Sequence, residues 1–505
     1  MDQKSLLSVS DDDIDTPSQS RKFLVVVTAG GKTNATPLFE IARILSTRGH
    51  VIEFATLDGQ QVWTQDYQFI SKIHILGPES SWETVHPSLS AFVVDPNLRP
   101  DFIIAGYLVD AVRDMKIEHD IPIAIHWPQM PTNMLPASYI SGASGLQIEV
   151  LTSEHATIWQ RLQIYLLGLR ALPSYLRYRS WTRQRRARLE VHHQLPTRSK
   201  PDHLLLVNSF FGLEPAKDIP PNVAAIGPVL SETYPALTPD LQSFTSNHKR
   251  ILYVSLGTHA LPDAVLQRIL SGATLALQSN QTIDGIIWSI RGMALKQFNL
   301  TPPAPHQLTS TSISSLISGA NPHIHFCTFA PQRALLAHPS VSIFLTHAGA
   351  SSTNEAVFHG IPTIALGVYF DQLSNAMKLR DAGVSIPLDR DTFSPGDLFQ
   401  AIETILDDET GSFAANCQRM QRIARIASRR KYLAADLIEE TLADAEGQRA
   451  AGDGRGMYLE TADMRMSVWK ARNWDLWALG VVEFLVGVGV VVVIPVALGG
   501  GGLTQ

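Results

Sequence analysis

Short apolar runs alternate with amphipathic stretches of helical period along most of this chain. The first run, Phe23–Val27, is followed by the helical pattern "PLFEIARILSTRG" and by a second apolar run, "VIEFAT". A further series begins at "RILYVSLGT" and continues through "GIIWSI", "IHFCTFA", "VSIFLTHAG" and "PTIALGV". Alternation of this kind is typical of βα units around a parallel sheet. The pattern therefore predicts an α/β protein with two Rossmann-like domains, whose ligands bind in the cleft at the carboxyl ends of the strands.

The chain length of 505 residues exceeds what one hydrophobic core supports, and shifts in composition indicate where the chain divides. The N-terminal stretch lacks the apolar run of a signal peptide and has the composition of a disordered acidic tail. A stretch rich in Pro, Ser and Thr is typical of a linker. We predict a tail at 1–21, an N-terminal domain at 22–230, a linker at 231–249, a C-terminal domain at 250–447, a juxtamembrane segment at 448–475 and a transmembrane helix at 476–498.

The C-terminal apolar stretch carries the prediction of a membrane anchor. As a helix, 476–498 would span about 34 Å at roughly 1.5 Å per residue, against a hydrocarbon core of about 30 Å. Glu483 opposes insertion, but the surrounding Val, Leu, Ile and Phe residues outweigh it. Arg465, Lys470 and Arg472 precede the stretch, so the positive-inside rule predicts a single-pass anchor with everything before Leu476 in the cytosol. The alternative is a buried apolar helix packed on the protein.

Charge and cysteine content narrow the class of protein. The net charge of −6 gives no reason to expect a nucleic acid as partner. Cys327 and Cys417 are the two cysteines, too few for a disulfide framework or a CxxC metal site. No spacing typical of a metal-ligand cluster occurs, so we expect no metal at the site.

A basic and aromatic stretch, "IWQRLQIYLLGLRALPSYLRYRSWTRQRRARLE", interrupts the βα pattern between the two series. One interpretation is a solvated helical face. The other is contact with an anionic membrane surface, with membrane lipid as a partner.

The most informative stretch is 329–376. The strand "VSIFLTH" ends at His347, and small residues, including Gly349, Ser351 and Ser352, lead into a helix. Small residues at a helix start let backbone N–H groups approach an anion, and the helix dipole favours a phosphate there. His347 and the two serine hydroxyls can add hydrogen bonds to that phosphate. Glu355 lies one helical turn after Ser351 and is placed to accept from a ribose diol.

Two further features complete this constellation. Asp371 and Gln372 follow the next strand at the same edge of the sheet, where a paired acceptor and donor suit sugar hydroxyls. Phe329 offers a flat apolar face on which a base can stack. Each residue has an ordinary structural explanation when taken singly, but the ordered set indicates a nucleotide-sugar site.

This ordered set resembles the signature of the family 1 UDP-dependent glycosyltransferases, which have the GT-B fold, and in particular fungal membrane-anchored members. The family pattern runs W-x-PQ, H-x-G-x-x-S, a Glu and then D/E-Q, and the resemblance extends from Phe23 to about Glu446. It implies that the N-terminal domain binds the acceptor and the C-terminal domain binds the UDP-sugar. Matched position by position, it assigns donor binding to Thr258, Phe329, Gln332, His347, Gly349, Ser351, Ser352, Glu355, Asp371 and Gln372.

Details of the match imply individual roles. Phe329 stands where the family has a Trp that stacks on uracil, and Gln332 reaches the nucleoside. Ser351 replaces the usual Asn beside the phosphates, which Ser352 also contacts. Thr258 in "YVSLGT" matches the hydroxyl residue that lines the phosphates. The remaining roles implied are pyrophosphate binding by His347, ribose binding by Glu355, and hexose binding by Asp371 and Gln372.

The family's catalytic base is missing from its usual position. The family has a His three residues before a Pro, and the residue three before Pro37 here is Asn34. The carboxylate that orients this His is retained, because Asp114 stands eight residues before Pro122. Asn cannot take a proton at neutral pH. Asn34 and Asp114 are therefore the two candidate catalytic positions, and Asn34 cannot act as the base.

Three hypotheses follow from the missing base. The acceptor is already ionised, such as a carboxylic acid or an acidic phenol; or Asp114 acts as the base, directly or through a water; or the protein binds the nucleotide sugar with weak or no transfer. The function predicted is an inverting, metal-independent hexosyltransferase of secondary metabolism. Its UDP-sugar is a co-substrate rather than a cofactor, glucose is the expected hexose, and the acceptor is a small lipophilic molecule such as a sterol, a fatty acid derivative or a polyketide-like compound.

Overall fold

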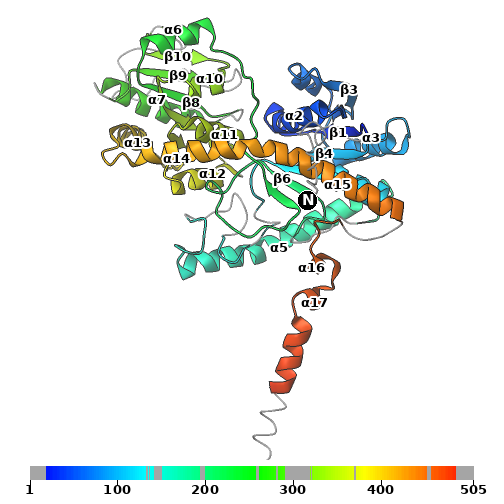
Figure 1. Cartoon of the computed structure of the whole chain (residues 1–505). Coiled ribbons are helices and arrows are strands. Elements are labelled where there is room, and N and C mark those ends of the chain that lie inside the picture. The colour runs from blue at the N-terminus through cyan, green and yellow to red at the C-terminus, as the bar shows by residue number, and fades with distance from the viewer. Residues whose placement is uncertain are drawn as a thin grey trace, which may run out of the picture.

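The computed structural model describes residues 19–131, 135, 137–140, 150–193, 200–257, 261–279, 282–290, 319, 321–368, 371–451 and 457–484. Thr258 and most of the predicted tail 1–21 lie outside these residues, as does part of the predicted transmembrane segment. In the described part of the chain, parallel strands form two sheets, each covered by helices (Figure 1).

The first sheet has the strand order β3-β2-β1-β4-β5-β6-β7. Its strands are rich in Ile, Leu, Val and Phe and are mostly buried, as expected for parallel strands with helices on both faces. The strands are β1 Lys22–Val26, β2 Val51–Thr56, β3 Ile70–Ile75, β4 Phe102–Gly106, β5 Ile123–Trp127, β6 Leu204–Val207 and β7 Val223–Ala225. The direction of winding reverses between β1 and β4, so the first ligand crevice is expected at the carboxyl ends of these two strands.

The second sheet repeats this topology, with the order β10-β9-β8-β11-β12-β13. Its strands are β8 Ile251–Ser255, β9 Gly285–Ser289, β10 Ile324–Cys327, β11 Val341–Thr346, β12 Thr363–Ala365 and β13 Ser385–Pro387. Here the winding reverses between β8 and β11. The loops that leave these two strands therefore flank the second expected crevice.

Helices cover both faces of each sheet. On the first sheet, α3 (Trp82–Val94) and α4 (Ala111–His119) pack on one face, and α2 (Lys32–Thr47) packs on the other. The helices packed against the second sheet are α6 Pro239–Asn247, α7 Asp263–Gln278, α10 Gln332–Leu336, α11 Ala350–His359, α12 Asp371–Asp381, α13 Pro395–Asp407 and α14 Ser412–Ala427. Further helical elements include α5 Ile158–Ala187, α15 Lys431–Ala451, α16 Ala462–Arg465, α17 Val468–Ala471 and the short 3₁₀ turns η1 Gln60–Thr64 and η2 Ser428–Arg430.

The long helix α15 returns from the second sheet to the first. Figure 1 shows this helix running from the second sheet to the first. Its Ala434 and Ile438 are buried in the core cluster that also contains α2. Arg48 of α2's C-terminal cap forms ion pairs with Asp436 and Glu439. The sequence-based division placed this segment with the C-terminal domain, whereas its packing joins it to the core of the N-terminal one.

The prediction of a C-terminal transmembrane helix at 476–498 is wrong. No helix in the described part of the chain combines the length and the apolar composition needed to cross a bilayer. The helical residues described here are 474–484, which span about 16 Å at roughly 1.5 Å per residue, against a hydrocarbon core of about 30 Å. They also include the carboxylates of Asp475 and Glu483. Residues 485–498 of the predicted segment lie outside the described residues, and the predicted single-pass anchor is not supported.

Candidate functional site

In each sheet, the point where the strand order reverses is called its switch point. The loops at the two switch points contain residues that the sequence analysis singled out. Asn34 lies in the first turn of α2, after β1, and Asp114 lies in α4, after β4. Gly257 follows β8, and His347 follows β11. Because these strands flank the reversals in the two sheets, the predicted acceptor and donor positions lie at the two places where open α/β sheets bind ligands.

His347 lies between two glycine-containing loops. A Cβ on Gly349 would come within 2.5 Å of His347 Nε2, and a Cβ on Gly257 would come within 2.8 Å of the same atom. Both distances are shorter than side-chain atoms tolerate, so glycine is required at both positions for the imidazole to keep this place. Gly257 also has a φ of 75°, a backbone conformation that favours glycine. The neighbouring Thr258, predicted to line the phosphates, lies outside the described residues.

The turn after β11 has an unusual backbone conformation at Ala348. This residue has a φ of 58° and is fully buried, which is uncommon for an alanine. Two polar contacts hold it there: Asn375 Nδ2 donates to the Ala348 carbonyl at 3.0 Å, and the Ala348 N–H donates to Thr346 Oγ1 at 3.2 Å. Strained residues of this kind cluster at ligand sites. This backbone conformation makes a sharp turn between β11 and α11, and α11 begins directly after Gly349.

The amino end of α11 contains a connected set of polar side chains. Gln332 Nε2 donates to Glu355 Oε2 at 2.7 Å and to Ser352 Oγ at 3.2 Å, while Ser351 Oγ donates to Glu355 Oε1 at 3.4 Å. Burial raises the pKa of Glu355, although the hydrogen bonds from Gln332 and Ser351 oppose this effect. The structure thus brings together four predicted donor-site residues, and Glu355 is the acceptor at their centre.

Asp371 and Gln372 occupy the first turn of α12, next to this set. Gln372 is buried, and its Oε1 accepts from the backbone N–H of Val368 at 3.0 Å, so part of its side chain shapes the preceding loop. Burial raises the pKa of Asp371, while the backbone N–H of Ala350 and the Asn375 amide, whose Nδ2 lies 3.3 Å from Asp371 Oδ2, favour the carboxylate. Asp371 therefore contacts the start of α11 directly. The predicted hexose contact thus lies next to the predicted phosphate position.

Phe329 is exposed rather than buried. Its exposed fraction is 67%, which is high for a large apolar side chain, and it follows the end of β10. An aromatic ring left open at a sheet edge is available for stacking on a planar ligand. Its position is therefore compatible with the predicted contact to a base.

The first domain contributes a residue that the sequence analysis missed. Tyr107 directly follows β4, and burial together with the nearby charge of Asp371 raises its pKa. Its ring also packs on Trp127, at the end of β5, with 4.8 Å between ring centroids. Tyr107 thus brings an aromatic ring of the first domain near the carboxylate of Asp371 in the second, the predicted hexose contact. Its position at the end of the apolar run "FIIAGY" was the one available signal.

Asn34 packs against the glycine loop that precedes it. A Cβ on Gly30 would come within 1.8 Å of Asn34 Nδ2, so the glycine gives this side chain its room. Asn34 is half-buried, in the first turn of a helix whose amino end points toward the switch point. Asn34, at the family's base position, is thus packed in a defined place, although its amide has no group that titrates.

Asp114 is fully buried and already surrounded by hydrogen-bond donors. Trp82 Nε1 donates to its Oδ2 at 2.8 Å, the guanidinium of Arg186 contacts both oxygens, and His193 Nε2 lies 2.8 Å from Oδ1. None of its described hydrogen bonds goes to Asn34. The carboxylate that the family uses to orient a base thus pairs here with residues at and after the end of α5. Sequence spacing gave no hint of Arg186 or His193, because both lie more than 70 positions from Asp114.

Asp114, Glu118 and His193 have the spacing of a metal-ligand group, although the sequence pattern revealed no such cluster. One ligand atom from each lies within 4.8 Å of the others. However, the Arg186 guanidinium already supplies a positive charge to Asp114, and His86 Nε2 lies 3.0 Å from Glu118 Oε2. The contacts therefore describe a network of ion pairs that joins α3, α4 and the end of α5.

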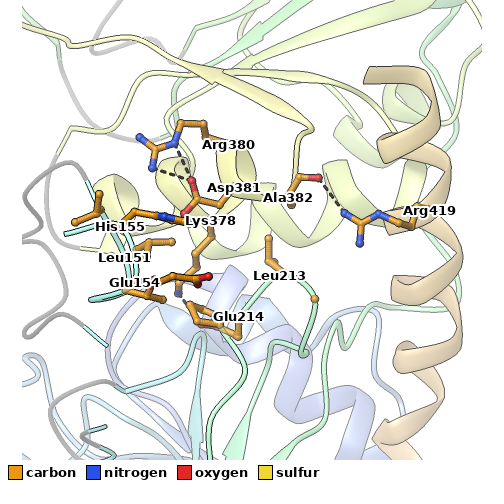
Figure 2. A pocket seen from close by; sticks show the side chains of 14 residues that line it. Leu151, Glu154, His155, Leu213, Glu214, Lys378, Arg380, Asp381, Ala382 and Arg419 are labelled. Carbon is orange, nitrogen blue, oxygen red and sulfur yellow. Dashed lines mark hydrogen bonds and ion pairs between the residues drawn. The ribbon is translucent and has the colours of Figure 1, made fainter. Parts of the chain in front are cut away.

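A cavity of about 840 Å³ lies at the other end of α12 from Asp371 (Figure 2). Its wall includes the buried ion pair between Lys378 Nζ and Glu214 Oε2, 2.9 Å apart, and the exposed pair Arg380 and Asp381. Arg419 closes one side by donating to the Ala382 carbonyl. None of the predicted donor residues lines this cavity, so we do not assign the nucleotide sugar to it.

Comparisons with known proteins identify the family to which this chain is similar. The family model described as "UDP-glucoronosyl and UDP-glucosyl transferase" matches residues 59–426. A UDP-glycosyltransferase of Talaromyces amestolkiae is 42% identical, with 94% of this chain and 97% of that protein covered. The UDP-glycosyltransferase stmC of Aspergillus ustus is 40% identical, with 93% of this chain and 96% of that protein covered.

Solved structures agree on the fold. The glycotransferase of kitacinnamycin superposes with a TM-score of 0.60 at 18% identity and covers 83% of this chain and 99% of its own. A UDP-glucosyltransferase from Polygonum tinctorium, described as capable of glucosylating indoxyl, gives a TM-score of 0.57 at 19% identity and covers 84% of this chain and 100% of its own. The predicted two-domain α/β architecture of the GT-B type is confirmed.

Proposed function

Because the chain belongs to the UDP-glucoronosyl and UDP-glucosyl transferase family, we propose that it transfers a hexose from a UDP-sugar to a small lipophilic acceptor, with inversion at the anomeric carbon. Glucose is the proposed hexose. The observation that supports this most directly is the arrangement around the end of β11. There His347, the amino end of α11 and the carboxylate of Asp371 lie next to one another.

The proposed reaction is a direct displacement. An acceptor oxygen attacks the anomeric carbon, the bond from that carbon to the diphosphate oxygen breaks, and UDP leaves with the bonding electrons. His347 and the backbone N–H groups at the amino end of α11 stabilise the negative charge that develops on the diphosphate. In this proposal protein groups supply the positive potential at the leaving group, and the UDP-sugar is a co-substrate.

The acceptor binds on the side of the first domain. The rings of Tyr107 and Trp127 provide an aromatic surface at the ends of β4 and β5, which suits a flat lipophilic molecule. A sterol, a fatty acid derivative and a polyketide-like compound remain the candidate classes. The relatives named above, from Talaromyces amestolkiae and Aspergillus ustus, are UDP-glycosyltransferases. The proposed role is in secondary metabolism.

The contacts of Asp114 favour one of the three hypotheses about the missing base. Trp82, Arg186 and His193 occupy the lone pairs that Asp114 would need to accept a proton from an acceptor or a water. An acceptor that is already ionised near neutral pH needs no base. We therefore propose a carboxylic acid or an acidic phenol as the acceptor group. This favours a fatty acid derivative or a polyketide-like compound over a sterol, whose hydroxyl is not ionised near neutral pH.

The second candidate is a nucleotide-sugar-binding protein with weak or no transfer, and Asn34 is the observation that favours it. Both candidates predict UDP binding, but they differ in turnover. Radiolabelled UDP-glucose incubated with a panel of carboxylic acids, acidic phenols and plain alcohols gives a glycosylated product only if the protein is a transferase. UDP binding without product from any acceptor class would favour the second candidate.

Replacing Asn34 with histidine is expected to raise transfer to plain alcohols by about 100-fold, the lower part of the range for a positioned general base. The new imidazole would occupy the half-buried position beside Gly30, at the amino end of α2. Transfer to an acidic phenol should change little, because that acceptor is already ionised. The measurement is kcat/KM for the two acceptor classes. A folded variant that binds UDP normally and gains nothing with alcohols would contradict the role assigned to position 34.

The affinity for the UDP-sugar is expected to fall as the pH is lowered, beginning above the pH at which an ordinary Asp titrates. Burial raises the pKa of Asp371, so this carboxyl takes up a proton at a higher pH than an exposed one and then loses an acceptor for the hexose hydroxyls. The measurement is KM for the UDP-sugar against pH. Asp371→Asn should raise KM by about 10-fold and flatten this acidic limb. If KM for the UDP-sugar still rises at acidic pH in Asp371→Asn as it does in the unchanged protein, another group is responsible for the titration.

A further inference from the structure

Helix α5 is a long helix with almost no packing surface of its own. It runs over Ile158–Ala187, and none of its residues is buried. Figure 1 shows it along the lower edge of the molecule, on the side from which α16 and α17 extend. Its C-terminal end is tied to the first domain by Arg185, whose guanidinium lies 2.8 Å from Glu83, and by Arg186, which pairs with Asp114. The apolar and aromatic side chains of such a helix are left exposed, which indicates that it packs against a partner.

One stripe of α5 is apolar and exposed at regular helical spacing. Positions that follow each other by alternating steps of four and three lie on one side of a helix. Six large apolar side chains follow this spacing, with exposed fractions between 42% and 82%: Ile158, Leu162, Tyr165, Leu169, Leu172 and Leu176. Trp159, Tyr175, Tyr178 and Trp181 are also exposed. At the helical period, Trp159 and Tyr175 flank this stripe, whereas Tyr178 and Trp181 lie toward the opposite face of the helix.

The charge of α5 is of one sign. Its residues include seven arginines and no Asp, Glu or Lys. The arginines that are exposed are Arg161, Arg170, Arg177, Arg179 and Arg183. The whole chain has a net charge of −6, so this positive segment is a local exception rather than a general property. Exposed arginines beside exposed leucines, tyrosines and tryptophans are typical of helices that lie in the headgroup region of an anionic bilayer.

We propose that α5 is a docking surface for an anionic lipid membrane, on which it lies flat without crossing it. The apolar stripe enters the boundary between headgroups and acyl chains, the flanking rings of Trp159 and Tyr175 lie at headgroup level, and the long arginine side chains reach lipid phosphates. The proposal rests on the exposure and charge of this helix. It does not depend on the proposed transfer reaction.

A second copy of the chain fits this surface less well. The four-three spacing also occurs in coiled coils, but there charges of opposite sign flank the apolar seam and pair across it. Two copies of α5 would bring seven arginines against seven arginines with no acidic residue between them. Pro173 lies inside the helix and further disfavours a continuous seam. An anionic lipid surface satisfies the charge and the apolar stripe at the same time.

Vesicle co-sedimentation of the full chain tests the proposal. We expect binding to phosphatidylcholine vesicles that contain about 30% phosphatidylserine, weaker binding to pure phosphatidylcholine, and loss of binding in about 0.5 M salt. Arg170→Gln, Arg177→Gln and Arg183→Gln combined should lower the partition coefficient by about 100-fold, since each basic residue near such a surface contributes roughly 5-fold. Leu169→Glu with Leu176→Glu should lower it by about 10-fold or more.

Matched controls come from α14 and the turn after it. Arg422→Gln, Arg429→Gln and Arg430→Gln combined remove the same charge from exposed positions, and Ile426→Glu places a carboxylate at a site with 66% exposure. Both controls should bind vesicles as the unchanged protein does. All the substituted positions are exposed, and an unaltered melting temperature and UDP affinity would confirm that the variants fold.

Three outcomes would overturn the proposal. The first is no binding to the anionic vesicles. The second is binding that the α5 variants and the α14 controls reduce equally, which would place the contact elsewhere. The third is a dimer in light scattering that Leu169→Glu with Leu176→Glu dissociates, without vesicle binding by the unchanged protein, which would make α5 a contact between copies.

Discussion

Replacing His347 with alanine is expected to lower kcat/KM for the UDP-sugar by about 100- to 1,000-fold, the range for losing one donor to a developing negative charge. The imidazole lies at the end of β11, where Gly257 and Gly349 leave it room, and next to the amino end of α11. Without it, the backbone N–H groups of α11 alone must stabilise the leaving diphosphate. The measurement is steady-state kinetics, with UDP binding by calorimetry beside it.

His192→Ala is the matched control, because His192 is an exposed histidine that has no predicted role. It should leave both kinetics and UDP affinity unchanged. His347→Ala should keep a normal melting temperature, since its ring is not part of a hydrophobic core. Normal turnover in His347→Ala would remove the main support for a diphosphate site at this strand end.

Replacing Lys378 with methionine is expected to lower the free energy of unfolding by about 3–5 kcal/mol, the cost of leaving a buried charge without its partner. Lys378 lies in α12, and Glu214 lies in the loop after β6. Both side chains are only 3% exposed, and Glu214 Oε1 also accepts from the backbone N–H of Met130. The pair thus joins the two domains beside the cavity of Figure 2. The measurement is urea unfolding, supported by the melting temperature.

The double variant Lys378→Met with Glu214→Leu should recover most of this loss, because it leaves no charge buried. Lys32→Met is the control for an exposed pair: its ammonium lies 2.9 Å from Asp66, with 49% and 73% of the two side chains exposed. It should change stability by no more than about 1 kcal/mol. If Lys378→Met is as stable as Lys32→Met, then Glu214 is solvated or finds another partner in the variant.

The donor side of the site could be predicted from sequence because its residues are close together in the chain. Gln332 lies in α10, and Ser351, Ser352 and Glu355 lie in α11, with one strand between the two short helices. The structure joins these four residues by hydrogen bonds. Asp371 follows one strand later. A site made of consecutive βα units leaves an ordered motif, whose spacing follows from strand ends and helix turns.

The acceptor side could be predicted only in part, because its contacts come from distant segments. The absence of a base at Asn34 and the presence of Asp114 are visible in the sequence. The partners of Asp114 are not: Trp82, Arg186 and His193 approach it from α3, from the end of α5 and from the residues after α5. No local spacing connects these residues. Tyr107 was missed for the same reason, since its relation to Asp371 exists only across the two domains.

The composition of 476–498 met the length and apolarity of a bilayer span, but no helix in the part of the chain that the structure describes is long and apolar enough to cross a membrane. The predicted transmembrane helix is therefore not supported. The basic and aromatic stretch was open to two interpretations from its composition, a solvated helical face or contact with an anionic membrane surface. The exposed apolar side chains along α5 favour the membrane contact.

By itself, the sequence determined the α/β class, the alternation of strands and helices along the chain, the donor motif and the lack of a base at position 34. These features depend on periodicity and on neighbours within a few residues, which a linear pattern records. Only the tertiary structure decided that α15 joins the first core, that Lys378 meets Glu214, and that Asp114 pairs with Arg186 and His193. Those contacts join segments far apart in the chain, and they form because buried charges and apolar faces need partners that only the folded arrangement supplies.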